Sequence, residues 1–106
     1  MLDINNGNFE KEVVKSNIPV IVDFWAPWCR PCISVASVFE KISKEHNKKL
    51  KFAKVNIEEN KELKEKHNIM GLPCLIVFHN GEEKTRLVGF KSENHLKEKI
   101  NIIANK

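Results

Sequence analysis

The segment Val20 to Trp25 constrains the fold of this chain more than any other, because nearly all of its residues are β-branched or aromatic. A continuous apolar strand is expected at the centre of a parallel sheet whose two faces are both covered. Pro19 precedes the segment, and Ala26-Pro27-Trp28 ends it. The rest of the chain must therefore supply helices for both faces of the sheet that contains this strand.

A helical pattern and a second strand follow. The spacing of three apolar residues predicts a helix from near Cys29 to about His46: Val35, Phe39 and Ile42. Lys51 to Ile57 is predicted as a second central strand, and Asn60 as the cap of a short charged helix that runs to about His67. Strand, helix, strand and helix in this order indicate a βαβ unit with parallel strands.

The second half of the chain has a different pattern. Asn80-Gly81 predicts a β-hairpin, since both residues of such a turn take positive φ. The antiparallel strands on either side are expected at Cys74 to Phe78 and at about Lys84 to Val88. Ser92 is expected to cap a last helix, whose apolar residues share one face: Leu96, Ile100 and Ile103.

The N-terminal segment completes the predicted fold. Leu2 to Ile4 is expected as a short strand, and the polar turn Asn5 to Asn8 as the start of a helix from Phe9 to Lys15. With 106 residues and no linker, the chain is expected to form one domain over residues 1–106. The predicted fold class is α/β, a mixed sheet built from a βαβ half and a ββα half and flanked by helices.

Composition and charge narrow the function. Lys and Arg exceed Asp and Glu by 18 to 14, but the two signs alternate in stretches such as Lys61 to Lys66. Solvated helix faces explain this pattern better than nucleic-acid binding does, and phosphate binding is the weaker alternative. The longest apolar run, Ile18 to Val22, is too short to span a bilayer, and the first residues do not resemble a secretory signal. We therefore expect a monomeric cytoplasmic protein that binds neither nucleic acid nor membrane.

Two of the three cysteines, Cys29 and Cys32, form a Cys-x-x-Cys motif where a buried strand ends and a helix begins. The unpaired N–H groups and the dipole at a helix N-terminus stabilise an anion, so the pKa of the Cys29 thiol should fall. Cys32 follows one turn later, within disulfide reach of Cys29. Pro31 occupies an early helical position, where its missing N–H costs nothing. This setting favours redox chemistry.

Metal binding and a structural disulfide are the alternatives. A zinc site needs four ligands, and the four histidines are scattered along the chain: His46, His67, His79 and His95. The helix histidines among these, His46, His67 and His95, are expected to be solvated. Cys74 stands alone and is expected to be a small buried hydrophobe. A disulfide that closes so short a loop would add little stability, and we expect no metal site.

The segment Trp25-Ala26-Pro27-Trp28-Cys29-Arg30-Pro31-Cys32 resembles the active-site segment of the thioredoxin family, Trp-Ala-x-Trp-Cys-Gly-Pro-Cys. The resemblance covers essentially the whole chain and extends to five further features: Asp23 before Phe24-Trp25, Lys54 within Phe52 to Ile57, Gly71-Leu72-Pro73, Asn80-Gly81 and Val88-Gly89. Three residues depart from the family pattern: Arg30 replaces Gly, Ser37 replaces Pro, and Cys74 replaces Thr.

The resemblance implies a thioredoxin fold and a protein disulfide reductase. Such a protein holds no bound cofactor, receives electrons from NADPH through a thioredoxin reductase, and acts on disulfide-containing proteins. Cys29 would be the attacking thiolate and Cys32 the resolving thiol. Burial within an apolar strand should raise the pKa of Asp23. The resemblance makes Asp23 the proton acceptor for Cys32, with Lys54 tuning it, whereas a locally hydrogen-bonded carboxyl without a catalytic role is the alternative.

The substrate-binding residues also follow from the resemblance. Pro73 is expected to be cis, which would leave the backbone of Leu72 free to pair with an extended substrate. The groove would be lined by Trp28, Arg30, Pro31 and Gly89. Trp25 is expected to support the packing rather than to contact substrate.

Two further functions compete with this one. The same groove could serve a non-redox binding module, but the presence of both Cys29 and Cys32 favours an enzyme. An oxidant or isomerase of an oxidising compartment is the other alternative. The absence of a recognisable signal and the Trp-Cys-x-Pro-Cys context argue against it.

Arg30 yields a prediction of its own. A cation next to Cys29 stabilises its thiolate, but solvent screening should limit the lowering of the thiol pKa to about half a unit. Titration of Cys29 at low salt should therefore give a higher thiol pKa in Arg30→Gly than in the wild type. Equal values would mean that Arg30 is a solvated residue whose charge does not reach the sulfur.

Overall fold

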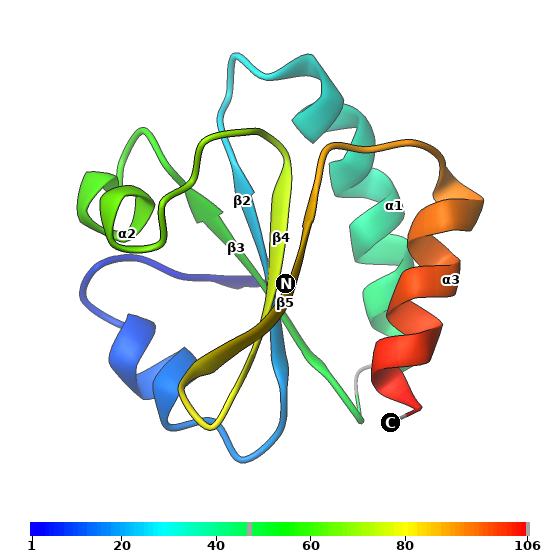
Figure 1. Cartoon of the computed structure of the whole chain (residues 1–106), viewed down its shortest axis with the longest axis horizontal. Coiled ribbons are helices and arrows are strands. Elements are labelled where there is room, and N and C mark those ends of the chain that lie inside the picture. Colours follow the sequence, from blue (N-terminus) through cyan, green and yellow to red (C-terminus); the bar gives the residue numbers. More distant parts are fainter. Residues whose placement is uncertain (47, 106) are drawn as a thin grey trace.

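The computed structural model describes residues 1–46 and 48–105 and consists of one mixed sheet between helices (Figure 1). The strands are β1 (Leu2–Asp3), β2 (Val20–Trp25), β3 (Lys51–Asn56), β4 (Cys74–His79) and β5 (Glu82–Val88). The helices are η1 (Glu10–Val14), a short π-helix, and α1 (Arg30–His46), α2 (Lys61–Lys66) and α3 (Glu93–Ala104). The predicted fold class is confirmed.

The strand order is β1-β3-β2-β4-β5. β3 pairs parallel with both β1 and β2, whereas β4 pairs antiparallel with β2, and β5 pairs antiparallel with β4. The parallel part is the predicted βαβ half, in which α1 connects β2 to β3, and the antiparallel part is the predicted ββα half. β2 lies at the centre of the sheet, as its apolar sequence predicts.

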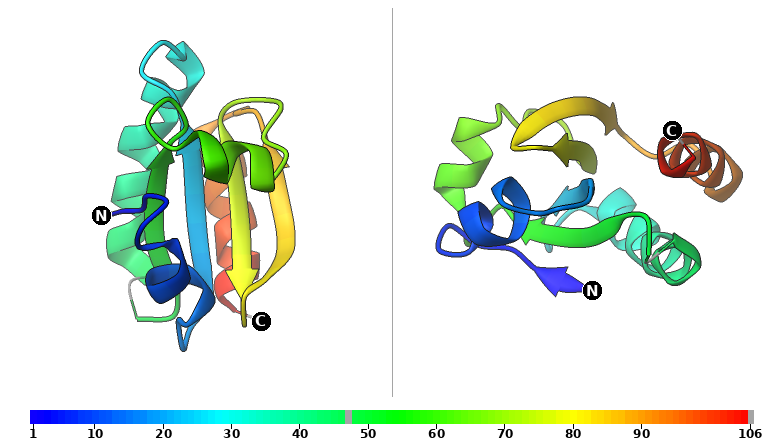
Figure 2. Two further views of the ribbon diagram at one scale, coloured as in Figure 1. Left: turned by 90° about the vertical axis from the view of Figure 1, so that its left-hand side faces the viewer. Right: turned by 90° about the horizontal axis from the view of Figure 1, so that it is seen from below.

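Helices cover both faces of the sheet (Figure 1; Figure 2, right). α1 and α3 lie on one face, and η1 and α2 lie on the other. Alternate residues of β2 serve the two layers: Ile21 packs in the cluster that contains Val35 and Phe39 of α1, whereas Val22 and Phe24 pack in the other cluster. The expectation that β2 is covered on both faces is therefore confirmed.

Turns and caps confirm most of the local predictions. Asn80 and Gly81 have φ of 56° and 77°, as the hairpin requires, although β5 begins at Glu82 rather than at Lys84. The Ser92 side chain accepts a hydrogen bond from the His95 N–H at 3.1 Å and caps α3. The first helix is shorter than Phe9 to Lys15, because only Glu10–Val14 form the π-helical turn.

Asn60 is the N-cap residue of α2, as predicted, but its side chain makes no capping hydrogen bond. Its Oδ1 instead accepts from the N–H of Asn6 at 3.1 Å, and its Nδ2 donates to the carbonyl of Asn56 at 3.0 Å. Asn60 is buried by these contacts. The side chain joins the N-terminal turn to the loop after β3, a long-range contact that a local capping pattern does not contain.

His67 is not a solvated helix residue, which corrects a second prediction. Its ring centroid lies 5.1 Å from that of Phe9, 5.2 Å from that of Phe78 and 5.9 Å from that of Phe24. The buried Nε2 has no hydrogen-bond partner in the part of the chain that the structure describes. Burial lowers the pKa of His67; the charges of Lys66 and Arg86 lower it further, and Glu83 opposes them.

This environment makes stability depend on pH. The folded protein binds a proton on His67 less readily than the unfolded chain does, so the free energy of unfolding should fall as the pH drops through about 6.5. His67→Phe should remove this part of the acid sensitivity and add about 1 kcal/mol, because an unpartnered buried nitrogen is lost. Denaturant unfolding between pH 5 and 8 measures both effects.

His95→Gln, which alters a partly exposed histidine on α3, is the control and should leave the pH dependence unchanged. If His67→Phe lost stability on acidification as steeply as the wild type does, His67 would not be the group responsible.

Candidate active site

Three loops meet at one end of the sheet: β2–α1, α2–β4 and β5–α3, at the top of Figure 1. They do so because β4 runs antiparallel to its two neighbours, so that its first residue, Cys74, is opposite Phe24 of β2 and Val88 of β5. The Gly89 N–H donates to the Pro73 carbonyl at 2.8 Å and joins two of the loops directly. The predicted site residues on these loops are thereby brought to the same end of the sheet.

Cys29 and Cys32 form a disulfide at the start of α1. Their Cα atoms are 5.3 Å apart, within the usual range for a disulfide. The main-chain N–H of Cys32 donates to Cys29 Sγ at 3.2 Å, so a free donor of the first helical turn points at this sulfur. Both residues are buried, and Cys29 is the more accessible, at 6% against 1% exposure. The arrangement suits a thiolate at Cys29 and a resolving thiol at Cys32.

Asp23 is buried in the middle of β2, with 3% of its surface exposed. It follows the same alternation as Ile21 and therefore faces α1. Its Oδ1 has no hydrogen-bond partner among the described residues. Burial raises the pKa of the carboxyl to about 7, and the charge of Lys54 opposes this shift less strongly. A carboxyl with such a pKa exchanges its proton near neutral pH.

Lys54 is opposite Asp23 in the register of β2 and β3. Its amine lies 3.7 Å from the Asp3 carboxylate and 5.9 Å from the centre of the Trp25 ring. The Lys54 amine therefore interacts with the Asp3 carboxylate and the Trp25 ring, and its charge also acts on Asp23. Among the described residues, Lys54 makes no ion pair or hydrogen bond with Cys29 or Cys32.

The residues predicted to bind substrate lie on the three loops at the end of the sheet where α1 begins, or in the first turn of α1 (Figure 1). Trp28 is 66% exposed, and its indole N–H donates to the carboxylate of Glu58. Arg30 and Pro31 are exposed on the first turn of α1. The Leu72–Pro73 peptide bond is cis, as expected, and Gly89 has a φ of 86° with open space where a Cβ would lie. The main chain of Leu72 makes no hydrogen bond to another segment within residues 1–46 and 48–105.

Three exposed apolar residues in these segments are not among the predicted site residues. Met70, in the α2–β4 loop, is 96% exposed; Val88, at the end of β5, is 61% exposed; and Ile33, in the first turn of α1, is 60% exposed. Gly71 allows the first two segments to approach, because a Cβ there would lie 2.8 Å from Val88 Cγ1. Exposed apolar residues in neighbouring segments are typical of an interaction surface. The sequence does not predict such a surface, because its residues are far apart in the chain and each is ordinary by itself.

Cys74 is 1% exposed, which confirms the expectation of a small buried residue. Burial raises the pKa of its thiol, against an opposing effect of the nearby Arg86 guanidinium. No group of three or more side chains that could hold a metal occurs among the described residues. In the same part of the chain, no helix is long and apolar enough to cross a bilayer.

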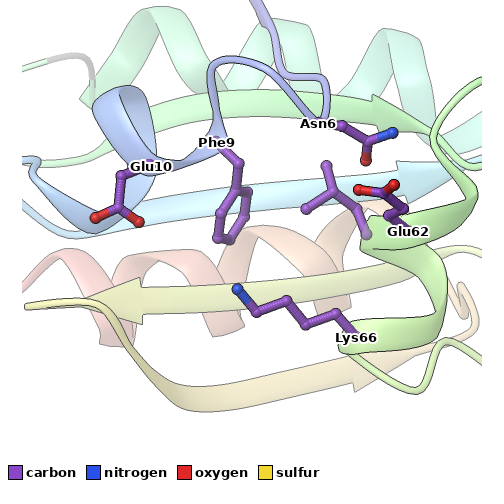
Figure 3. Close-up of a pocket in the computed structure, with 6 residues that line it drawn as sticks. Asn6, Phe9, Glu10, Glu62 and Lys66 are labelled. Carbon is purple, nitrogen blue, oxygen red and sulfur yellow. The ribbon is translucent and has the colours of Figure 1, made fainter.

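A hollow of about 240 Å³ between η1 and α2 contains none of the predicted site residues (Figure 3). Phe9 and Leu63 form its apolar floor, and its rim is polar or charged: Asn6, Glu10, Glu62 and Lys66. The Lys66 amine lies 5.9 Å from the centre of the Phe9 ring. Neither Cys29 nor Cys32 lines this hollow, so it is not part of the candidate site. The chemistry of that site is the thiol–disulfide exchange of the cysteine pair.

Comparison with known proteins gives one consistent result. The model of the family described as Thioredoxin matches residues 1–102. The chain is 44% identical to a thioredoxin of Rickettsia bellii over 99 residues, which cover 93% of this chain and 94% of that protein. It is 35% identical to a thioredoxin of Pseudomonas aeruginosa over 96 residues, which cover 91% of this chain and 89% of the relative.

The raised pKa of Asp23 yields a stability prediction. The folded protein keeps this proton up to about pH 7, whereas the unfolded chain releases it near the usual value of 3.8. The free energy of unfolding should therefore fall as the pH rises from about 4 to 7, by roughly 4 kcal/mol from this group. Asp23→Asn should be more stable than the wild type at pH 8 by up to that amount, and about equally stable below pH 4.

Urea unfolding at a series of pH values measures this difference. Asp3→Asn, which changes the exposed aspartate of β1, should shift stability by less than about 1 kcal/mol at any pH. A difference between Asp23→Asn and the wild type that did not depend on pH would contradict the raised pKa.

Proposed function

The chain belongs to the thioredoxin family and is a thiol–disulfide oxidoreductase, and from that premise we propose that it works as a protein disulfide reductase with Cys29 as nucleophile. The observation that carries the proposal is the cysteine pair at the start of α1, with the Cys32 N–H directed at Cys29 Sγ. This donor and the helix N-terminus favour the anionic form of the sulfur that is the more accessible of the two.

The proposed reaction has two exchange steps. The Cys29 thiolate attacks one sulfur of the substrate disulfide, forms a mixed disulfide and releases the other sulfur as a thiolate. Cys32 then loses its proton and attacks Cys29 Sγ, which breaks the mixed disulfide. The substrate leaves with two reduced sulfurs, and the chain keeps a Cys29–Cys32 disulfide, so two electrons have passed to the substrate.

Asp23 is the group proposed to accept the proton of Cys32. The carboxyl lies on the α1 side of β2, is buried, and has a pKa of about 7, so it can take up and release a proton near neutral pH. Lys54, the residue of β3 opposite Asp23, stabilises the charged form and tunes this exchange. The unpartnered Oδ1 is consistent with a group that is kept for its proton rather than for a structural contact.

The substrate is proposed to lie as an extended segment beside Leu72 and cis-Pro73, where the main chain of Leu72 is free to pair with it. Trp28 and Gly89 flank this position, and Arg30 and Pro31 form its rim on α1. Disulfide-containing proteins are therefore the proposed substrates. A thioredoxin reductase that draws on NADPH is the proposed source of the two electrons, in a cytoplasmic, monomeric protein that needs no bound cofactor of its own.

A non-redox binding module is the alternative function, and no observation on this chain favours it. Both reacting cysteines are present, and they are bonded to each other at a helix start. The two functions differ in whether electrons reach the substrate, so a single assay separates them.

The assay is reduction of insulin disulfides with NADPH and a thioredoxin reductase. The wild type should consume NADPH, and Cys29→Ser should be inactive, because the nucleophile is lost. Cys32→Ser should accumulate mixed disulfides with substrate that are visible on non-reducing gels, since attack succeeds and resolution fails. Cys74→Ser is the matched control: the third cysteine is a buried free thiol whose pKa is raised by burial, so it has no part in the proposed exchange, and its loss should leave the rate within about twofold of the wild type.

Two results would count against the proposal. Normal turnover by Cys32→Ser would overturn the order of attack. A wild type that binds unfolded protein but consumes no NADPH with any reductase tested would favour the binding module.

A further inference from the structure

Strand β5 holds the α2–β4 loop, which carries Leu72 and Pro73, at both of its ends. At the end near β4, the Gly89 N–H donates to the Pro73 carbonyl at 2.8 Å, and Gly71 packs against Val88. At the end near α2, the contact is made by Arg86 alone among the described residues of β5. The main-chain N–H groups of Asn68 and Ile69 also bond back to α2, and the contacts from β5 and Gly89 hold the rest of the loop against the sheet.

The Arg86 side chain reaches the end of α2. Arg86 is opposite Ile76 in the register of β4 and β5, and Ile76 packs in the core layer on the α2 side of the sheet, so Arg86 points to that side. Its Nη2 donates to the His67 carbonyl at 2.9 Å, and its Nη1 lies 3.5 Å from the Asn68 carbonyl. Carbonyls at a helix C-terminus lack helical partners and carry partial negative charge, which a guanidinium satisfies.

Glu83 holds this guanidinium in place. Its two carboxylate oxygens accept from Arg86 Nε and Nη2, both at 2.6 Å, in a bidentate pair. The side chains of Arg86 and Glu83 are only 30% and 35% exposed. A paired guanidinium with two short bonds has little freedom to turn, so its remaining donors are aimed at the α2 end. The Glu83 side chain makes no other hydrogen bond among the described residues, so its hold on the α2–β4 loop passes through Arg86.

The carbonyls that Arg86 binds lie where the chain changes direction. Asn68 has a φ of 51°, in the left-handed region, and directs the chain from α2 into the loop. Ile69 then turns into the core, and Met70 turns outward to 96% exposure, two residues before Leu72. A change in the orientation of the His67–Asn68 peptide groups would therefore move Met70 and Leu72 relative to the cysteines.

We propose that Arg86 is a positioning residue for polypeptide substrates: by binding the carbonyls at the end of α2, it presents Met70 and the main chain of Leu72 beside the reacting disulfide. This inference rests on the proposed function and deepens it. Arg86 touches no reacting atom, so it should affect how an extended substrate docks and not how sulfur exchanges. A small disulfide, which has no main chain to pair with Leu72, should be indifferent to Arg86.

The experiment compares two substrates of pre-reduced protein in a stopped-flow instrument. Insulin is the polypeptide disulfide and 5,5′-dithiobis(2-nitrobenzoate) is the small one; both reactions are followed under single-turnover conditions, by tryptophan fluorescence and by absorbance respectively. Arg86→Met, which keeps the side chain long but removes the fork, should lower the second-order rate constant for insulin by about five- to tenfold. The same variant should leave the second-order rate constant for the small disulfide within about twofold of the wild-type value.

Lys84→Met is the matched control, because Lys84 is an exposed cation on the same strand with only a 3.7 Å ion pair to Glu82. It should leave both rate constants unchanged. Arg86→Lys keeps the charge without the bidentate geometry and should fall between Arg86→Met and the wild type. These two variants separate the hydrogen-bonding geometry from the charge of the strand.

Glu83→Gln provides a test by coupling. Since Glu83 is proposed to act only through Arg86, Glu83→Gln should slow insulin reduction moderately, and the double variant should be no slower than Arg86→Met alone. Additive losses would overturn the proposed link. Glu83→Gln also keeps the inference testable if Arg86→Met fails to fold.

Two other outcomes overturn the inference. Equal loss of rate with both substrates would show a general effect on the site, and an unchanged rate with insulin would show that the clamp does not position the loop. A wild type that reduces neither substrate would instead refute the proposed function, so the two failures are distinguishable.

Discussion

The burial of β2 on both faces is the constraint on which the rest of the structure depends. A strand with Val22 and Phe24 on one side and Ile21 on the other cannot lie at a sheet edge, so β3 and β4 must flank it and helices must cover both layers. β3 joins in parallel through α1, whereas β4 joins antiparallel. The amino end of β4 thereby meets the carboxyl end of β2, which brings Pro73 to the cysteines.

Within this arrangement, the redox chemistry depends on two further features, the start of α1 and the buried carboxyl of Asp23. α1 begins directly after Cys29, and the main-chain N–H of Cys32 in its first turn points at the Cys29 sulfur rather than at solvent. Asp23 is the costly component, because burial without a partner for Oδ1 raises its pKa to about 7 at the expense of stability. A polar group retained under such conditions is typical of functional sites, where a proton must be exchanged near neutral pH.

β5 connects the two halves of the site. It is an edge strand with exposed charged residues, which protect such a strand from pairing with another chain. Arg86 and Val88 of this strand nevertheless contact the start and the middle of the α2–β4 loop, and Gly89, directly after the strand, bonds to the end of the loop. A strand with no fully buried residue therefore helps to determine the geometry of the surface on which a polypeptide substrate is proposed to lie.

The sequence by itself determined several features that depend only on neighbours in the chain. The hairpin at Asn80-Gly81, the Ser92 cap and the cysteine pair at a helix start each involve residues within one turn, so their patterns suffice. The tertiary structure alone decided the place of His67 and the role of Arg86. His67 follows the pattern of a solvated helix end, yet aromatic rings from three other elements or turns surround it. Burial and long-range hydrogen bonds are fixed only when the layers pack, because the partners are distant in the chain and no local pattern contains them.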